Sequence, residues 1–227
     1  AFGKRSSLDQ KMERGFIQKK SPWLAVKGHY NGDFPDDLVA LHNFKGGYCG
    51  VSKVENGHLN ICYLTDYQSF KAHKNITDFQ KQVLYKNPHL KEVFENCIPL
   101  FDQPLTISQI SFEKKEPVYN HILMVGDTAG LIHPLCGNGM AMAIHSARIC
   151  AELSIQFLNG SISSRIILEE KYHKEWNLNF KNRLAVGKLL SGIIRKEKLF
   201  APLLNLLIKF PSILPQIIKK THGKPII

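Results

Sequence analysis

The residues best suited to chemistry gather in one stretch near the middle of the chain, MVGDTAGLIHPLCGNGMAMAIHSARICAE. Asp127 follows an apolar run, and an acid at the carboxyl end of a buried strand can accept hydrogen bonds from polyol hydroxyls. Gly137 and Gly139 would let the backbone approach a flat ring closely. A helix that begins beside them would turn its N–H groups and positive dipole end toward negative charge on that ring. The pattern predicts one side of a binding site for a polyol joined to such a ring.

The same stretch resembles the second flavin motif of the FAD-dependent oxidoreductases, a family that includes geranylgeranyl reductases, aromatic hydroxylases and flavin-dependent halogenases. That motif, Gly-Asp-x-Ala-x-x-x-x-Pro-x-x-Gly-x-Gly, is matched without a gap at Gly126, Asp127, Ala129, Pro134, Gly137 and Gly139. The resemblance implies FAD as cofactor and Asp127 on its ribityl chain. It also implies that the loop and the helix start, with Asn138 and Met140, lie against the isoalloxazine. No residue is singled out as a catalytic acid or base, because in this family the flavin carries most of the chemistry.

A second, shorter resemblance lies at the start of the chain. The segment AFGKRSSLD matches the family motif Ala-Asp-Gly-x-x-Ser-x-x-Arg at Ala1, Gly3 and Ser6, and departs from it at Phe2 and Asp9. The G-x-G-x-x-G phosphate loop of the family does not occur in these 227 residues. We therefore expect an N-terminally truncated chain that needs a missing N-terminal segment of the same protein, holds FAD weakly alone and is inactive by itself.

The stretches before this motif predict a sheet. From Trp23 to Thr65 the chain reads as short strands rich in β-branched and aromatic residues, WLAVKGHYN, DLVALHN, GGYCGVSKV and GHLNICYLT, with a tight turn at Asn56-Gly57. An antiparallel meander is expected in the place of the family's substrate domain. A capping box at Thr77 predicts a helix of about ten residues, TISQISFEKK predicts a half-buried strand, and HILMVGD predicts a fully buried one.

The stretches after the motif predict helices. Residues 140–158 predict a helix packed tightly against a sheet, and helices broken at Pro202, Pro211 and Pro215 follow. The fold class is α/β: part of an FAD-binding three-layer domain with an antiparallel substrate-domain sheet and a helical C-terminal extension. Its expected parts are an FAD-domain remnant over 1–20, the substrate-covering sheet over 21–115, the closing strand and helix of the FAD domain over 116–160, and a basic helical extension over 161–227.

Several other side chains have both a functional and a structural interpretation. His133 and Cys136 flank Pro134 and could face the reacting edge of the ring, although most such residues are structural. His145 on the apolar helix is expected to be a core histidine with its hydrogen bonds satisfied. Three residues on the predicted strands could line a substrate cavity or be plain core, namely His42, Tyr48 and Tyr63.

Charge and cysteine content indicate the partners and the cellular compartment of the protein. The net charge is +11, and residues 161–227 carry 13 Lys/Arg against 4 Asp/Glu. Because Leu and Ile alternate with Lys and Arg there, the tail has the pattern of an amphipathic segment at a membrane surface; ordinary helical packing is the alternative, and nothing points to nucleic acid. The 5 cysteines show no C-x-x-C spacing, which favours reduced thiols in the cytoplasm and implies no metal site. No run of apolar residues is long enough to span a bilayer.

The functional hypothesis is an FAD-dependent reductase or monooxygenase that acts on an apolar, isoprenoid-like small molecule, cytoplasmic or peripheral on the membrane. The alternative is a non-catalytic module with a truncated flavin fold that docks on a membrane or a protein partner.

Overall fold

The computed structural model describes residues 1–194 and 196–223, and it divides the chain into two compact units. The sheet unit comprises Lys20–Ile110 and Ile194–Phe200. The helical unit comprises Ala1–Lys19, Ser111–Ile193 and Ala201–Ile227. The expected division into four parts stays a prediction.

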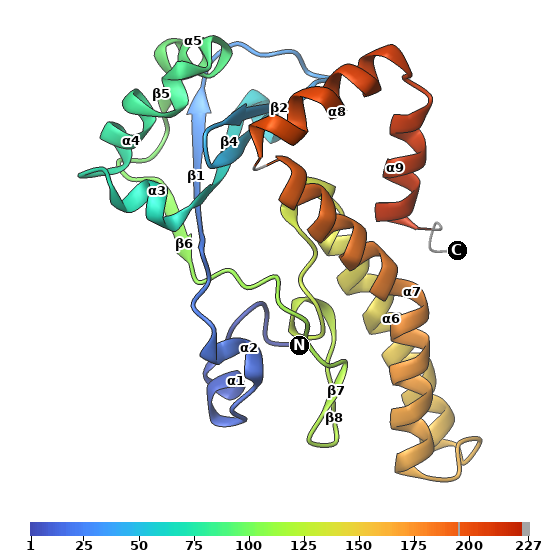
Figure 1. Cartoon of the computed structure of the whole chain (residues 1–227). Helices are drawn as coiled ribbons and strands as arrows, with labels where there is room; N and C mark the ends of the chain where they lie inside the picture. Colours follow the sequence, from blue (N-terminus) through green and yellow to red (C-terminus); the bar gives the residue numbers. More distant parts are fainter. Residues whose placement is uncertain (195, 224–227) are drawn as a thin grey trace. The chain divides into compact units, whose positions relative to one another are not determined.

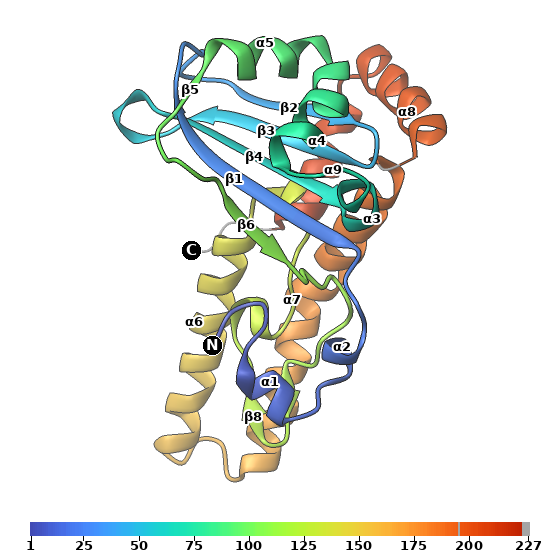
Figure 2. The same cartoon turned by 90° about the vertical axis from the view of Figure 1, so that its left-hand side faces the viewer.

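The sheet unit is built on one antiparallel sheet with the strand order β2-β3-β4-β1-β5, and β6 also pairs with β1 (Figures 1 and 2). The predicted antiparallel strands are confirmed, but only β2, β3 and β4 form a meander, because β1 pairs with β4 and not with β2. The strands are β1 (Trp23–Asn31), β2 (Val39–Phe44), β3 (Gly47–Lys53), β4 (Leu59–Asp66), β5 (Ile98–Pro99) and β6 (Leu105–Ser108). The turn between β3 and β4 is a short 3-10 segment, η1 (Glu55–Gly57), in which Asn56 and Gly57 have φ of 63° and 74°. These positive values explain why the turn uses Asn and Gly.

Alternate residues of the central strands point to one face of this sheet, where they form an apolar core. Val26 on β1, Val51 on β3 and Ile61 on β4 are each at most 2% exposed. Helical segments cover this face (Figure 2), namely α3 (Tyr67–Lys71), α4 (Ile76–Gln82), η2 (Leu84–Lys86) and α5 (Pro88–Asn96). On the opposite face, which we call the open face, the apolar side chains of Leu41, Leu105 and Ile107 are exposed.

Two expectations for this unit were wrong in detail. The helix near Thr77 begins at Ile76 and is capped by Asn75, whose Oδ1 accepts the N–H of Asp78 at 2.8 Å. Asn is as good an N-cap as Thr, and Asn75 lies two residues before Thr77. In the segment TISQISFEKK only β6 is a strand, and its residues are all exposed because β6 lies at the edge of the sheet.

The helical unit is organised by two long helices, α6 (Gly139–Leu158) and α7 (Arg165–Ile194), which run side by side (Figures 1 and 2). The buried residues of α7 recur every third or fourth position, so they form one face. They are Leu168, Tyr172, Trp176, Phe180, Arg183, Gly187 and Ser191. Large aromatic residues in the middle of this face pack with Met142 and Ile149 of α6. The predicted helix over 140–158 is confirmed, and Asn159-Gly160 ends it with Gly160 at φ 82°.

The other elements of this unit are short. They are α1 (Ser7–Lys11), α2 (Gly15–Gln18), the hairpin of β7 (Val118–Tyr119) and β8 (Ile122–Leu123), η3 (Gly126–Thr128), η4 (Pro134–Cys136) and α9 (Ile213–His222). The prediction of a fully buried strand at HILMVGD was wrong. In the described part of the chain β8 is a two-residue strand that pairs with β7 alone, and Ile122 is 39% exposed.

The C-terminal helices differ from expectation at two of three prolines. Pro202 lies inside α8 (Glu197–Lys209) and Pro215 inside α9, whereas Pro211 lies between them. Pro215 is tolerated because the N–H groups of the first helical turn have no partner within the helix. No single helix in the described ranges is long and apolar enough to cross a membrane; the stretches Lys198–Lys209 and Ile213–His222 reach that length only together, with a bend of 114°.

Candidate functional site

The turn η3 is fixed against the first turns of α6. The N–H of Gly126 donates to Ser146 Oγ at 3.0 Å, and that hydroxyl donates to the carbonyl of Ala143. Gly126 has φ 66°, and a Cβ there would lie 3.3 Å from the Cβ of Ala143. Glycine is thus needed twice, for the backbone conformation and for the close approach to α6. These contacts hold the next residue, Asp127, at a fixed position relative to the helix.

Asp127 has a half-buried carboxylate beside two lysines. Burial raises the pKa of this carboxyl, while the charges of Lys115 and Lys4 act in the opposite direction. Lys115 Nζ donates to the main-chain oxygens of Asp127 at 2.7 Å and of Lys4 at 2.9 Å. Within residues 1–194 and 196–223, no hydrogen bond reaches the carboxylate oxygens of Asp127. The carboxylate therefore remains able to accept hydrogen bonds from a ligand.

The start of α6 offers a second set of open groups. Its N-cap residue, Asn138, makes no side-chain cap hydrogen bond; its Nδ2 instead donates to Thr221 O at 2.7 Å. The buried Oδ1 of Asn138 has no donor among the described residues. The first N–H groups of α6 lack intrahelical partners, and they stand next to Gly137, which has φ 68°. A polar or anionic ring edge placed here would find free donors.

The structure brings several of the predicted site residues together. Gly126, Asp127 and Gly139 line one small depression with Met142 and Ser146. Pro134 and Gly137 are exposed on the loop before α6, and Met140 is 84% exposed on the first turn of α6. Ala129 is fully buried, so its side chain packs in the core and does not face this depression. The open polar groups of this region are the Asp127 carboxylate and the uncapped start of α6.

The N-terminal segment is tied to η3 by bonds that the sequence did not predict. The N–H of Phe2 donates to Thr128 Oγ1 at 3.1 Å, and this hydroxyl donates to Gly3 O at 3.0 Å. Arg14 has no exposed side-chain surface; its Nη1 lies 3.0 Å from Asp9 Oδ1 and donates to Thr128 O at 2.9 Å. Asp9, where the motif commonly has Arg, also closes a capping box with Ser6.

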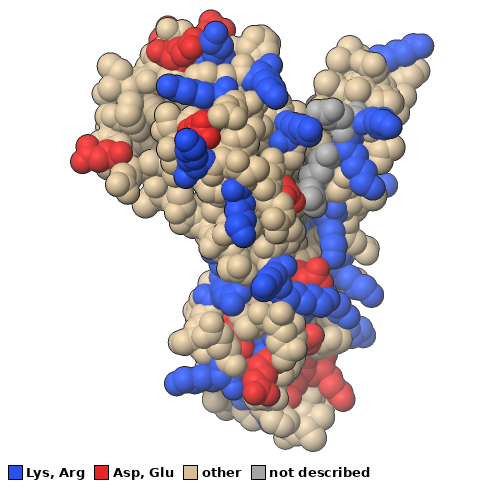
Figure 3. All heavy atoms as spheres, turned by 60° about the vertical axis from the view of Figure 1, so that its left-hand side comes forward, with Lys and Arg blue, Asp and Glu red and all other residues tan. Residues whose placement is uncertain are grey.

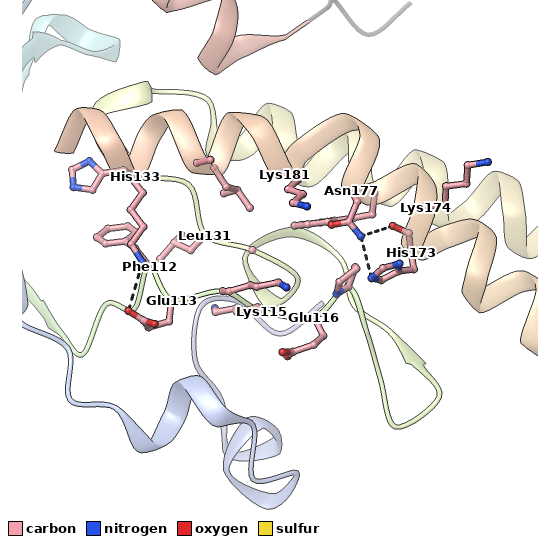
Figure 4. Close-up of a pocket in the computed structure, with 17 residues that line it drawn as sticks. Phe112, Glu113, Lys115, Glu116, Leu131, His133, His173, Lys174, Asn177 and Lys181 are labelled. Carbon is pink, nitrogen blue, oxygen red and sulfur yellow. Dashed lines mark hydrogen bonds and ion pairs between the residues drawn. The ribbon is translucent and has the colours of Figure 1, made fainter. Parts of the chain in front are cut away.

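A larger pocket of about 670 Å³ lies next to these residues within the helical unit (Figure 4). It is lined by residues 112–117, by Gly130, Leu131 and His133, and by the stretch of α7 from His173 to Lys188. His133 is buried at this wall, with its ring centroid 4.6 Å from that of Phe112. Cys136 is buried too, and burial raises its pKa to about 11, so it is a thiol at neutral pH.

The remaining candidates lie elsewhere. Tyr63 is 2% exposed on the helix-covered face of the sheet, where it stacks on Phe79, and His42 belongs to the same face. Both are therefore unsuited to line a cavity on the open face, whereas Tyr48 belongs to that opposite face. His145 packs edge-on against Phe180, and its Nδ1 has no partner in the described part of the chain, so the expectation of a satisfied histidine was wrong.

The described residues contain no group of three His, Cys, Asp or Glu side chains that could hold a metal ion. The five cysteines are free thiols, and burial raises the pKa of each.

Two curated proteins are similar in sequence, while no protein-family profile matches the chain. Conditioned medium factor receptor 1 of Dictyostelium discoideum is 26% identical over 155 residues, which are 64% of this chain and 28% of that protein. Digeranylgeranylglycerophospholipid reductase 2 of Methanothermobacter thermautotrophicus is 30% identical over 79 residues, 34% of this chain and 20% of that protein. The chain thus spans less than a third of each relative.

Solved structures show the fold. A flavin-dependent brominase, Bmp2, superposes with a TM-score of 0.67 at 15% identity, over 88% of this chain and 50% of its own. PqsL from Pseudomonas aeruginosa, described as a probable FAD-dependent monooxygenase, superposes with a TM-score of 0.61 at 14% identity, over 90% of this chain and 58% of its own. The myxobacterial chondrochloren halogenase superposes with a TM-score of 0.62 at 16% identity, over 78% of this chain and 42% of its own. Over about nine-tenths of its length, the chain therefore has the fold of the FAD-dependent halogenases and monooxygenases, which confirms the resemblance at the level of fold.

Proposed function

We propose that the protein is an FAD-dependent oxidoreductase, a reductase or a monooxygenase, and that this chain supplies one side of its flavin site. The observation that carries the proposal is the combination of the half-buried Asp127 carboxylate, which accepts no hydrogen bond from the described residues, with the uncapped start of α6. The fold shared with FAD-dependent enzymes supports the same assignment. When bound, FAD would supply the hydride or oxygen-transfer chemistry.

The roles of the residues follow from their positions. Asp127 would accept hydrogen bonds from the ribityl hydroxyls, and Lys115, through its bond to Asp127 O, would keep this turn in place. Gly137, Asn138 and Gly139 would present backbone N–H groups to the ring, and Pro134 and Met140 would contact its edges. Gly126 would position the turn against α6. Ala129, being buried, would act only through packing.

We also propose that the substrate is an apolar, isoprenoid-like small molecule. The reductase relative is named for a substrate with geranylgeranyl chains. In the sheet unit, the open face with Leu41, Leu105 and Ile107 is an apolar surface of the kind that such a chain would contact. The phosphate-binding loop typical of the family would come from a segment outside these 227 residues; the chain covers only 50% of the brominase, which supports this expectation.

A peripheral position on a membrane would suit such a substrate. The apolar side chains of α8 and α9 are exposed, and Lys209, Lys219 and Lys220 are the described basic residues of their last turns. Apolar side chains with flanking cations are typical of segments that lie in the interface of an anionic bilayer.

The second candidate function is a non-catalytic module that docks on a membrane or a protein. The longer of the two sequence matches is to a protein named as a receptor, and this match supports the docking module as the second candidate. Flavin binding separates the two candidates, because a docking module needs no cofactor.

Absorbance spectroscopy and FAD titration of the protein with its adjoining sequence would test the proposed function. We expect a visible flavin band in the wild-type protein and its loss in Asp127→Ala, with the thermal unfolding transition unchanged. Glu152→Ala is the matched control, since this acid lies on the exposed side of α6 and pairs only with Arg148 among the described residues. Equal FAD content in all three proteins would remove Asp127 from the site, and no flavin in any of them would favour the docking module.

A further inference from the structure

The pocket of about 670 Å³ in Figure 4 lies beside the small depression at Asp127, and Gly130 and Trp176 line both hollows. None of the eight residues assigned to the flavin lines it, although Gly130, Leu131 and His133 lie between them in sequence. Its volume falls in the range that is typical of sites for small organic ligands. It lies entirely within the helical unit, so its walls do not depend on the sheet unit.

One side of the pocket is apolar and aromatic. Trp176, Leu184 and Leu131 contribute to it, and Pro117 and Phe112 face them from the segment before β7. Gly130 makes this wall possible, because a Cβ at that position would lie 2.9 Å from both the indole of Trp176 and a methyl of Leu184. Because the Gly130 backbone packs closely on the Trp176 indole, the pocket has an apolar surface that an aromatic ring or an alkyl chain of a ligand could contact.

The rim of the pocket is basic. Lys114, Lys174 and Lys181 form no ion pair with any carboxylate of the described residues, and all three are exposed. The two acids at the pocket are already paired: Glu113 with Lys19 at 3.1 Å and Lys188 at 3.8 Å, and Glu116 with Arg14 at 3.7 Å.

The pairing of Glu113 has an electrostatic signature. The hydrogen bond from Lys19 and the charge of Lys188 hold its pKa below the usual range. Positive charge is therefore in excess at the rim. Figure 4 shows the amine of Lys181 directed from α7 into the hollow, on the same helix face as Asn177.

We propose that this pocket binds a small organic anion, with an apolar ring or chain against Trp176 and Leu184 and a carboxylate or phosphate held by Lys181. An apolar body and one anionic group match the two sides of the pocket, since the wall is apolar and the rim carries lysines that form no ion pair within the described residues. The Asn177 side chain also lies at the rim, where its Nδ2 donates to the carbonyl of His173 at 2.8 Å. The pocket does not require flavin, so this proposal is independent of the proposed function.

Isothermal titration calorimetry on the full chain tests the proposal with naphthyl phosphate, naphthoate and uncharged naphthalenemethanol. We expect the two anions to bind and the alcohol to bind about tenfold more weakly or not at all. Tighter binding of the phosphate or of the carboxylate would identify which anionic group the pocket prefers. Lys181→Ala should weaken anion binding by about tenfold. Lys171→Ala is the matched control, because Lys171 is exposed on α7 and does not line the pocket.

Each result decides the proposal. Anion binding that Lys181→Ala weakens and Lys171→Ala does not would support it. Equal affinity for the alcohol, equal affinity of the Lys181→Ala variant, or no binding of any probe would overturn it. FAD that displaces naphthyl phosphate competitively would also overturn it, because the pocket would then be part of the flavin site.

Discussion

Arg14 is the charged residue on which the turn before the flavin loop most depends. It has no exposed side-chain surface, and it joins Asp9, the carbonyl of Thr128 and the carbonyl of Glu116. A buried ion pair of this kind is not in itself strongly stabilising, but the loss of one partner leaves the other charge buried and unpaired. Its main effect is therefore to fix the N-terminal segment against η3.

We expect Arg14→Ala to lower the free energy of unfolding by about 3–5 kcal/mol, because Asp9 would remain buried without its partner. Urea denaturation measures this loss. In the control Arg148→Ala, the pair with Glu152 is exposed on α6, and a change below about 1 kcal/mol is expected. Equal losses in the two variants would show that the Arg14 pair is no more important than a surface pair.

Lys115 leads to a prediction on pH. It is 3% exposed, and burial lowers its pKa to about 8 from the ordinary lysine value of 10.5. Between these two values the unfolded chain binds more protons at this site than the folded chain, so its contribution to stability rises as pH rises. We expect the stability of the wild type relative to Lys115→Met to increase from pH 8 to pH 10.5 in urea denaturation. A constant or falling difference would mean that Lys115 stays charged in the folded protein.

The sequence predicted part of this site and could not predict the rest. Asp127 and the glycines stand in one contiguous pattern, so local spacing was enough to select them. Arg14 and Lys115 act on main-chain oxygens, and Arg14 reaches Thr128 across 114 positions of the chain. A carbonyl acceptor leaves no trace in residue type, and therefore nothing in the pattern marked either residue.

At the level of elements, composition and turn residues predicted the strands β1 to β4, and a long apolar stretch predicted the helix α6. The prediction failed at HILMVGD, where an apolar run is a two-residue strand with Ile122 exposed. Composition cannot distinguish a strand inside a sheet from an apolar segment without sheet neighbours. The expectation that proline breaks a helix also failed, because α8 includes Pro202 and because Pro215 lies in the first turn of α9, where an N–H has no partner within the helix.

Gly130 and Gly139, in and after the loop before α6, are expected to have different roles, one in folding and the other in FAD binding. A Cβ on Gly139 would meet only Ile132 Cγ2, at 3.8 Å, whereas one on Gly130 would lie 2.9 Å from Trp176 and Leu184. We expect Gly139→Ala to fold as the wild type and to bind FAD more weakly, because the methyl group would occupy space needed by the ring. Gly130→Ala should lose about 1–3 kcal/mol of stability through overpacking. Thermal unfolding and FAD titration of both variants check this, and a destabilised Gly139→Ala with normal FAD affinity would reverse the assignment.

For the whole molecule, the most informative surface is the face of α6 that its own unit does not cover. Met140, Ile144, Ile155 and Leu158 are 61–84% exposed and lie at the repeat of one helix face. The sequence predicted a sheet against this helix, but among the described residues none packs there. An apolar face of this extent is typical of an interface. It is also consistent with a chain that covers only about half of the solved relatives.

Charge is the other property of the molecule as a whole. The sequence carries a net charge of +11, and Figure 3 shows basic side chains scattered over the face in view, with acidic ones in small separate groups. Such a balance attracts anionic partners over a distance that salt shortens. The basic C-terminal helices also carry exposed apolar side chains. Electrostatic attraction of these helices to an anionic bilayer and insertion of their apolar side chains into it can therefore be tested separately.

The last prediction concerns α8 and α9 at an anionic bilayer. Their exposed apolar residues include Ile208 at 68% and Ile218 at 46%, and Lys219 and Lys220 lie in the last turn of α9. Each basic residue near an anionic surface contributes about 1 kcal/mol, which salt screens, whereas inserted apolar side chains resist salt. In liposome co-sedimentation we expect binding to anionic vesicles that weakens but persists at high salt.

Removal of both charges with Lys219→Gln and Lys220→Gln should remove the salt-sensitive part of this binding, and Ile208→Ser should remove the salt-resistant part. Leu178→Ser is the control, because this residue is 74% exposed on α7 outside these helices. Equal recovery in the supernatant with neutral and anionic vesicles, at low and high salt, would leave α8 and α9 as ordinary helices of the fold.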